Sequence, residues 1–524
     1  MGALMLNACV EMDLQPEGAT LTTDIKQEVS TAMPDRAEAS VRAIFSQFNV
    51  YAPNYGVFGN RVRHNDFGYS SIMMFTDANT EDWSGADDGY NWAGNSMTYD
   101  DRPYTSYESD IVWNDHYNII FAANSVVGSI DPATTDALSQ FYLAQGLASR
   151  GFAYLGLAQL YQFNYKGNED KPCVPLITDQ NADDAAVNGA KRASVQEVYD
   201  QIDADLTEAI RLLEASEAVG QTRPDRRYID LAVSFGLRAR MNLAMQNYAQ
   251  AALDADSAIY YTDARPATIA EVSAPAFASA AEPNWMWGIL IAETDDVVSS
   301  GIVNWISHCG TFNYGYCQYS GGHQISKKLY NVIPESDVRK GWWSNAEGKS
   351  ANIPAAWQDY LDELEFPKYT SCKFAPYQNI LDNDVNANDI PLMRVEEMYL
   401  IKAEAQAMSG ADGKTTLENF VKTYRDPEYT STGNVQDDVY LQKRIELWGE
   451  GLIWYDVMRL NKGIDRRGAG FPITAVLKID ADDPILLWRL PQTEIQGNSA
   501  LTDDDNNKST EVPTPVDDDE TVKL

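Results

Sequence analysis

Residues 394–410 read RVEEMYLIKAEAQAMSG, in which apolar side chains recur at steps of three and four residues: Met398, Ile401, Ala405 and Met408. This spacing, the frequent alanines and the closing glycine predict an amphipathic helix. About forty residues later, residues 444–459 read RIELWGEGLIWYDVMR and interleave charges with large apolar side chains. Charged groups are costly to bury alone and tolerable when they are paired. We therefore expect the two segments to form helices that pack against one another.

A third segment lies towards the carboxyl end, where residues 490–498 read LPQTEIQGN. These three ordered segments resemble the signatures of the SusD/RagB family, the lipid-anchored nutrient-binding proteins on the outer surface of Bacteroidetes cells. Two positions depart from the family pattern: Ile453 replaces a residue that is often basic, and Ser499 replaces a frequent proline. Both departures fall in scaffold segments.

The resemblance implies a mainly α protein with a SusD-like fold, tetratricopeptide-like helix pairs and long inserted loops that form the ligand face. We divide the chain accordingly into a lipoprotein anchor and leader (1–20), a single SusD-like domain (21–500) and an acidic tail (501–524), with a helical scaffold at 36–51, 107–260 and 390–460 and loop-rich binding regions at 52–106 and 264–389. The tail is expected to be solvated or paired only locally.

An internal repeat supports the helix pairs. Aromatic and small residues share offsets of three, seven and ten in two places 49 residues apart, at Tyr199, Ile202, Leu206 and Ala209 and at Tyr248, Ala251, Ala255 and Ala258. This pattern resembles the second helix of a tetratricopeptide repeat, where such residues let paired helices approach closely.

Composition excludes some partners. The chain has 524 residues and a net charge of −37, which repels nucleic acids and anionic lipid surfaces. No run of eighteen or more apolar residues is present to span a bilayer. Leu6-Asn7-Ala8-Cys9 has the form of a bacterial lipoprotein cleavage site. We expect Cys9 to carry the lipid that anchors the protein to the extracellular face of the outer membrane.

Signatures of enzymes and metal centres are absent. The four histidines form no metal-binding pattern, no cysteines form a C-x-x-C pair, and neither a G-x-S-x-G elbow nor a P-loop occurs. We expect no catalysis and no cofactor. Asp77, Asn79, Glu81 and Asp82 could hold a structural calcium ion, although the glycine of an EF-hand loop is missing. Cys309 and Cys317 could close a small loop if their geometry allows it.

Aromatic rings with polar neighbours point to carbohydrate binding, because sugars lay their C–H faces on such rings and exchange hydroxyl hydrogen bonds with polar side chains. Both loop-rich regions combine these residue types. The candidate ligand contacts are Trp83, Tyr90, Trp92, Asn95, Trp305, Tyr314, Tyr316 and Tyr319. Trp83 and Trp92 are preferred because their neighbours are polar. The alternative for each ring is packing between loop and scaffold, which we expect for Trp285 and Trp287.

These features and the resemblance lead to one main hypothesis. The protein captures an oligosaccharide at the cell surface and passes it to a SusC-like, TonB-dependent outer-membrane transporter. Two alternatives remain open: a peptide-binding member of the same family, and an extracellular enzyme that degrades glycans.

Overall fold

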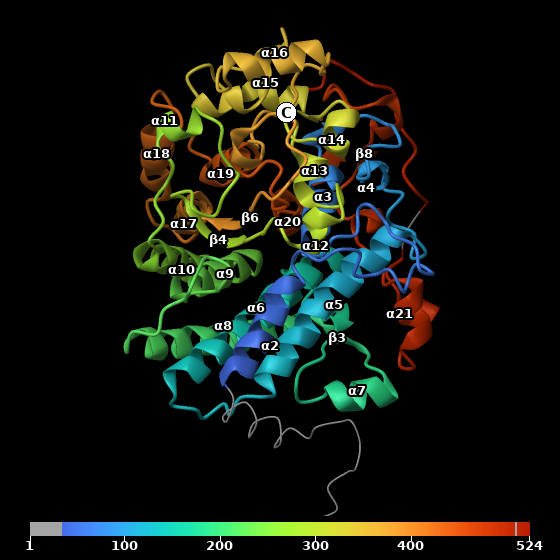
Figure 1. Cartoon of the computed structure of the whole chain (residues 1–524), viewed down its shortest axis with the longest axis vertical. Coiled ribbons are helices and arrows are strands. Elements are labelled where there is room, and N and C mark those ends of the chain that lie inside the picture. Colours follow the sequence, from blue (N-terminus) through green and yellow to red (C-terminus); the bar gives the residue numbers. More distant parts are fainter. Residues whose placement is uncertain (1–33, 509–510) are drawn as a thin grey trace, which may run out of the picture.

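The structure is a computed structural model that describes residues 34–508 and 511–524, and it is mainly helical, as predicted (Figure 1). The α-helices are α2 (Pro34–Ser46), α3 (Tyr69–Asn79), α4 (Gly94–Thr98), α5 (Tyr107–Val127), α6 (Ala137–Tyr161), α7 (Ala182–Asn188), α8 (Val195–Glu217), α9 (Leu231–Ala244), α10 (Tyr248–Tyr261), α11 (Ile269–Val272), α12 (Asp296–Ser299), α13 (Trp305–Cys309), α14 (Tyr316–Tyr319), α15 (Lys327–Val332), α16 (Ala355–Glu363), α17 (Val395–Met408), α18 (Gly413–Tyr424), α19 (Val435–Glu446), α20 (Ile453–Arg459) and α21 (Gln492–Gly497). No helix in this part of the chain is long and apolar enough to cross a membrane.

Strands are short and pair two by two. The antiparallel pairs are β1 (Trp83–Gly85) with β5 (His323–Ile325), β2 (Pro172–Pro175) with β3 (Arg192–Ser194), β4 (Trp285–Ile289) with β6 (Ile390–Arg394), and β7 (Ile464–Asp465) with β8 (Lys478–Ile479). Short 3₁₀ turns lie between them: η1 (Val338–Trp342), η2 (Tyr377–Asn379), η3 (Ile473–Ala475), η4 (Pro484–Leu486) and η5 (Asp503–Asp505). The β1–β5 pair joins the two loop-rich regions that we predicted from the sequence.

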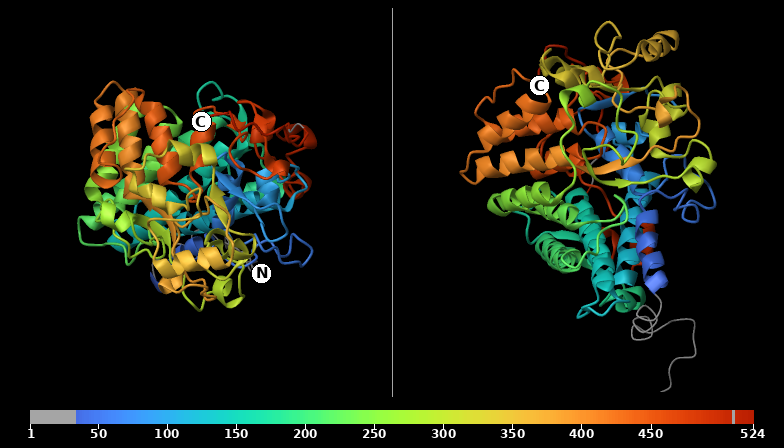
Figure 2. Two further views of the ribbon diagram at one scale, coloured as in Figure 1. Left: turned by 90° about the horizontal axis from the view of Figure 1, so that it is seen from above. Right: turned by 60° about the vertical axis from the view of Figure 1, so that its left-hand side comes forward.

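Helices pack in pairs along one side of the molecule. Helices α6, α8, α9, α10, α17 and α18 pack in succession, and most of them are stacked at the left of Figure 1 and face the viewer at the right of Figure 2. The repeat positions of α8 and α10 lie in these contacts, where Tyr199, Leu206, Ala251 and Ala258 are buried. The small residues of α10 let it approach its neighbours closely, as the repeat pattern predicts.

Charges of the signature segments are paired inside the protein. Arg459 donates to both carboxylate oxygens of Glu404 at 2.7 and 2.6 Å, and Arg240 donates to both oxygens of Glu397 at 2.7 and 2.6 Å. The prediction that helices 394–410 and 444–459 pack through ion pairs is therefore confirmed, with the second segment divided between the end of α19 and α20.

A larger set of paired charges, which we call the ion cluster, lies where these segments meet the loops. Its members are Asp337, Arg339, Lys373, Arg394, Glu396, Arg425, Glu446 and Glu450. Their side chains are at most 2% exposed. Four acids face four bases, so the cluster is formally neutral, which is the condition under which buried charges are tolerated.

The signature segment also anchors the first loop-rich region. Arg444 donates to Asp82 at 2.8 Å and to Glu81 at 2.8 Å, and the indole N–H of Trp448 donates to the carbonyl oxygen of Asp82 at 2.8 Å. Asp77 accepts the backbone N–H of Gly451 at 2.8 Å. The acids proposed for calcium therefore serve as protein–protein anchors. The described residues hold no group of three or more His, Cys, Asp or Glu side chains arranged for a metal ion.

Two boundaries differ from the sequence-based expectation. Region 52–106 contains α3, whose residues are all buried, so it has no polar face for periodicity to reveal. The start of the tail 501–524 is docked instead of solvated, because Asn506 exchanges hydrogen bonds with the backbone of Leu490 at 2.9 and 2.8 Å. Asn507 also donates to the carbonyl oxygens of two buried residues. Cys309 and Cys317 are both free and buried.

Candidate functional site

Three exposed tyrosines from the two loop-rich regions meet at the surface. Tyr90, Tyr314 and Tyr319 are 52%, 37% and 53% exposed. The ring centroids of Tyr90 and Tyr319 are 5.7 Å apart, and those of Tyr314 and Tyr319 are also 5.7 Å apart. We call this group the tyrosine surface. It brings together residues that are more than 200 positions apart in the sequence.

Local hydrogen bonds fix the backbone that carries these rings. The carboxylate of Asp88 accepts the N–H groups of Tyr90 at 2.9 Å and of Asn91 at 3.1 Å, which forms a turn. Tyr314 donates its N–H to the carbonyl oxygen of Asn383 at 3.1 Å. Its own carbonyl oxygen accepts from the side chain of Asn386 at 2.8 Å. The rings are therefore mounted on ordered loops, which lowers the entropy cost of binding.

Pairing of β1 with β5 requires a glycine beside the site. Gly85 faces His323, and a Cβ atom at Gly85 would lie 2.7 Å from the Nδ1 atom of His323 and 2.9 Å from the Nδ2 atom of Asn91. Burial lowers the pKa of His323 to about 3, so its ring is neutral at neutral pH. The close approach holds the Tyr90 loop against the strand that follows Tyr319.

Trp92 and Tyr316 lie beside the tyrosine surface but are less accessible. The ring of His64 stacks on Trp92 with centroids 4.7 Å apart and an interplanar angle of 4°, and it hydrogen-bonds the hydroxyl of Tyr316. His64 therefore covers one face of the indole. Tyr316 is 9% exposed, whereas Asn95 is exposed and donates to Glu108 at 3.1 Å.

Trp83 and Trp305 correct the sequence prediction. Trp83 is 2% exposed and stacks on His323 at a centroid distance of 3.7 Å. Trp305 is fully buried and packs edge-on against Phe374 at 5.0 Å. Neither ring offers a face to a ligand, because each is enclosed by other parts of the chain. The expectation that Trp285 and Trp287 belong to the core is confirmed.

A cavity of about 500 Å³ lies next to the tyrosine surface, and we call it the side cavity. It is lined by Arg63, Asp87, Asp88, Trp92, Asn95, Glu108, Thr474 and Pro513, among others. Sequence reasoning found Trp92 and Asn95 but missed Arg63, His64 and Glu108, which have no local motif. The Asp87-Asp88-Gly89 turn before Tyr90 was the available signal for the loop.

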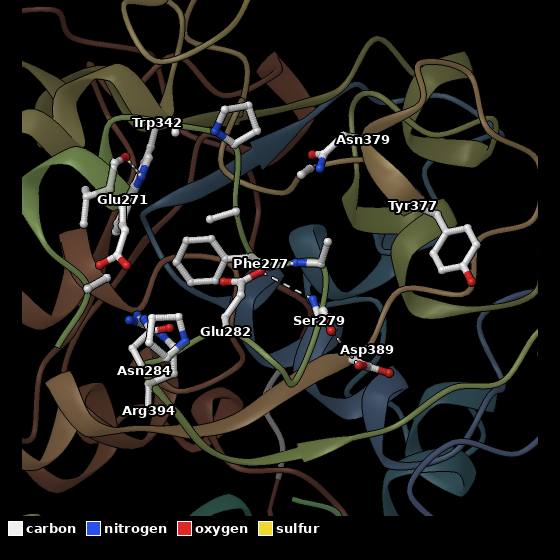
Figure 3. A pocket seen from close by; sticks show the side chains of 18 of the residues that line it. Glu271, Phe277, Ser279, Glu282, Asn284, Trp342, Tyr377, Asn379, Asp389 and Arg394 are labelled. Carbon is white, nitrogen blue, oxygen red and sulfur yellow. Dashed lines mark hydrogen bonds between the residues drawn. The ribbon is translucent and has the colours of Figure 1, made fainter. Parts of the chain in front are cut away.

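Another cavity, of about 620 Å³, lies over the ion cluster (Figure 3). Its acids already have partners. Glu282 accepts the N–H of Ala278 at 2.8 Å, and Asp389 accepts those of Ala280 at 2.8 Å and Ile291 at 2.9 Å. These bonds hold the loop that forms the cavity wall. We therefore assign a structural role to these carboxylates and place the candidate site at the tyrosine surface.

Two buried carboxylates lie beneath the loop that carries Arg63 and His64. Asn54 donates its side-chain amide to Asp66 at 2.9 Å and to Asp115 at 3.1 Å. Burial raises the pKa of Asp66 to about 6. Burial and the nearby Asp66 raise the pKa of Asp115 well above its usual range. Both groups hold protons more tightly in the folded state than in the unfolded state.

The stability that such acids contribute is present below their unfolded pKa, near 3.8, and is lost as pH rises through the folded pKa. Asp115→Asn is therefore expected to raise the free energy of unfolding at pH 7 by about 1–3 kcal/mol, with little gain at pH 4. Urea denaturation of variant and parent between pH 4 and pH 7 measures this difference, with exposed Asp131→Asn as the control. A difference that is the same at every pH contradicts the assignment.

Comparison with known proteins completes the description of the site. Residues 25–229 match a family model described as "Starch-binding associating with outer membrane", and residues 365–510 match the model of the SusD family. No curated protein matches the chain. A SusD-like carbohydrate-binding protein from Bacteroides vulgatus is similar in structure, with a TM-score of 0.71, 22% identity and coverage of 91% of this chain and 98% of that chain.

Two further structures extend the comparison. A SusD superfamily protein from Bacteroides thetaiotaomicron has a TM-score of 0.69 and 20% identity, and the match covers 90% of this chain and 99% of that chain. Surface glycan-binding protein A from the same organism, in complex with laminarihexaose, has a TM-score of 0.63 and 16% identity over 90% of this chain and 99% of that chain. At these identities the likeness shows the fold.

Proposed function

Because this chain belongs to the SusD/RagB family, we propose that it is a non-catalytic protein of the cell surface that binds an oligosaccharide and passes it to a SusC-like, TonB-dependent outer-membrane transporter. The anchor in this proposal is a lipid on Cys9, a residue that lies outside the described part of the chain. The structure of surface glycan-binding protein A with laminarihexaose supports an oligosaccharide as the ligand class.

The tyrosine surface is the observation that carries the proposal. Exposed aromatic rings lose contact with water when a sugar lays its C–H face on them, and the tyrosine hydroxyls remain free to bond sugar hydroxyls. Polar side chains border the rings, since Gln318 lies one position before Tyr319 and Asp88 two positions before Tyr90. Gln318 is held towards the same loops by its bonds to Tyr360 at 2.6 Å and Asp382 at 3.0 Å. Rings and hydrogen-bonding groups on fixed loops are the elements that sugar binding needs.

Tyr319→Ala is expected to weaken oligosaccharide binding by about 1–3 kcal/mol, because the variant removes the ring that contacts both other tyrosines. The melting temperature should change little, since the side chain is half exposed. Isothermal titration against a panel of neutral oligosaccharides that includes laminarihexaose measures the effect.

Two variants serve as controls. Tyr319→Phe keeps the ring and should retain most of the affinity. Tyr260→Ala removes a tyrosine that is 80% exposed on α10, outside the site, and should leave affinity unchanged. Binding of peptides with no response to any glycan would overturn the sugar assignment. Recovery of shortened oligosaccharides after incubation would instead indicate an enzyme.

A further inference from the structure

The side cavity has chemistry of its own, beyond the exposed rings beside it. Three polar side-chain atoms are buried and have no hydrogen-bond partner: Nε of Arg63, Nε1 of Trp92 and Oε2 of Glu108. All three belong to residues that line the cavity. A buried polar atom without a partner costs about 1–3 kcal/mol. Three of them around one cavity indicate that a polar guest completes the site.

Glu108 is the most constrained of the three. It is 1% exposed, and its Oε1 atom accepts from the side chains of Asn65 and Asn95, each at 3.1 Å. Those two bonds fix the carboxylate and leave Oε2 unused. The guest must donate to this oxygen and accept from the N–H groups of Arg63 and Trp92. Hydroxyl groups do both, so a polyhydroxylated ligand meets the requirement.

The charge of the lining narrows the class of sugar. Four carboxylates, those of Asp87, Asp88, Asp100 and Glu108, line the cavity together with one guanidinium, that of Arg63. Two like charges brought together in a partly buried site repel one another. A uronate or sulfated unit would add a further negative charge here. The lining therefore favours an uncharged sugar.

The carboxyl-terminal segment closes the cavity on one side. Val512, Pro513 and Pro515 line it. After them, Val516 donates its N–H to the carbonyl oxygen of Val476 at 2.9 Å, and Asp518 accepts the N–H of Gly468 at 2.6 Å. Before them, the docked Asn506 and Asn507 hold the chain. Residues 511–516 thus form a wall between two anchored points.

From these observations we propose that the side cavity holds one or two uncharged sugar units at an end or branch of the glycan bound on the tyrosine surface, and that residues 511–516 limit how far the glycan extends. This inference rests on the proposed function. A cavity of about 500 Å³ is within the range of small-molecule sites, which is roughly 300–1,000 Å³, and accommodates such a unit.

The first test is Glu108→Gln, which keeps the acceptor for Asn65 and Asn95 and replaces Oε2 by an amide group. Titration with laminarihexaose, cellohexaose and maltohexaose should show about ten-fold weaker binding of the hexasaccharide that the parent binds best. The melting temperature should stay equal or rise, because burial raises the pKa of Glu108 and a charged buried group is removed. A structural role alone would instead lower the melting temperature and leave the affinity unchanged.

The second test addresses charge. The double variant Asp87→Asn, Asp88→Asn should bind hexagalacturonic acid at least about three-fold more tightly than the parent, with the neutral hexasaccharide unchanged. Asp131→Asn, an exposed carboxylate outside the site, is the matched control. A parent protein that prefers hexagalacturonic acid to all neutral hexasaccharides overturns the proposal.

The third test removes the wall. A chain that ends at Lys508 retains Asn506 and Asn507 and should bind the neutral hexasaccharide about five-fold more weakly. Unchanged affinity in this chain contradicts the role of residues 511–516. If Tyr319→Ala weakens binding and Glu108→Gln does not, the inference fails while the proposed function stands. If no oligosaccharide binds the parent, both fail.

Discussion

Glu446→Gln is expected to lower the free energy of unfolding by about 3–5 kcal/mol. Glu446 is fully buried and accepts hydrogen bonds from three guanidiniums: Arg425 at 2.7 and 2.9 Å, Arg394 at 2.9 Å and Arg339 at 3.1 Å. The amide keeps the shape of the carboxylate but leaves one positive charge of the ion cluster without a counter-charge. Urea denaturation at pH 7 measures the loss.

The exposed pair on α8 supplies the control. Glu208 pairs with Arg211 at 2.5 Å, and both side chains are largely in solvent. Glu208→Gln is therefore expected to cost less than about 1 kcal/mol. Similar losses for the two variants would show that the ion cluster contributes no more than a surface pair. The Glu446 variant should still bind oligosaccharide below its melting temperature, since the cluster does not line the side cavity.

The same carboxylate predicts how stability responds to acid. Burial alone would raise the pKa of Glu446, but Arg425, Arg394 and Arg339 lower it well below its usual range. Stability from such a group is fully present above the unfolded pKa, near 4.5, and is lost as pH falls towards the folded pKa. Its loss therefore belongs below pH 4.5. The buried pair Asp66 and Asp115 acts in the opposite direction above pH 4.

The scaffold was predictable because its signal is local. Helical spacing in residues 394–410 identified α17, and interleaved charges implied the pairing of Glu404 with Arg459. The partners of the ion cluster were not predictable in this way. Lys373 and Arg339 come from irregular segments, and their pairing with Glu450 and Glu446 depends on the tertiary fold.

The site was predictable as a region and less so as individual rings. Polar neighbours suggested that Trp83 is exposed, but its neighbour Asp82 is buried because Arg444, more than 360 positions later, neutralises it. A polar residue next to a ring thus reports exposure only when its charge has no distant partner. Tyr90 and Tyr319 have no such partner nearby and are exposed. The start of the tail misled for a related reason, since the amides of Asn506 and Asn507 are satisfied by backbone groups.

Trp83→Ala is expected to lower the free energy of unfolding by about 3–5 kcal/mol, the cost of leaving a large cavity in a core. The ring is 2% exposed and is enclosed between β1, β5 and the ring of His323. This outcome reverses what the local sequence suggests, which is a ligand contact with little effect on stability. Thermal and urea denaturation measure the loss.

Affinity separates the two roles of the aromatic residues. Titration with the neutral hexasaccharide, at a temperature where Trp83→Ala is fully folded, should give a dissociation constant within about two-fold of the parent. Tyr319→Ala should show the opposite pattern, with weaker binding and an unchanged melting temperature. Because β1 and β5 join the two loop-rich regions, a large loss of affinity in Trp83→Ala would mean that the tyrosine surface depends on this packing for its geometry. A Trp83→Phe variant then decides the matter: it keeps a ring against His323, and it should restore stability and affinity together if packing is the cause.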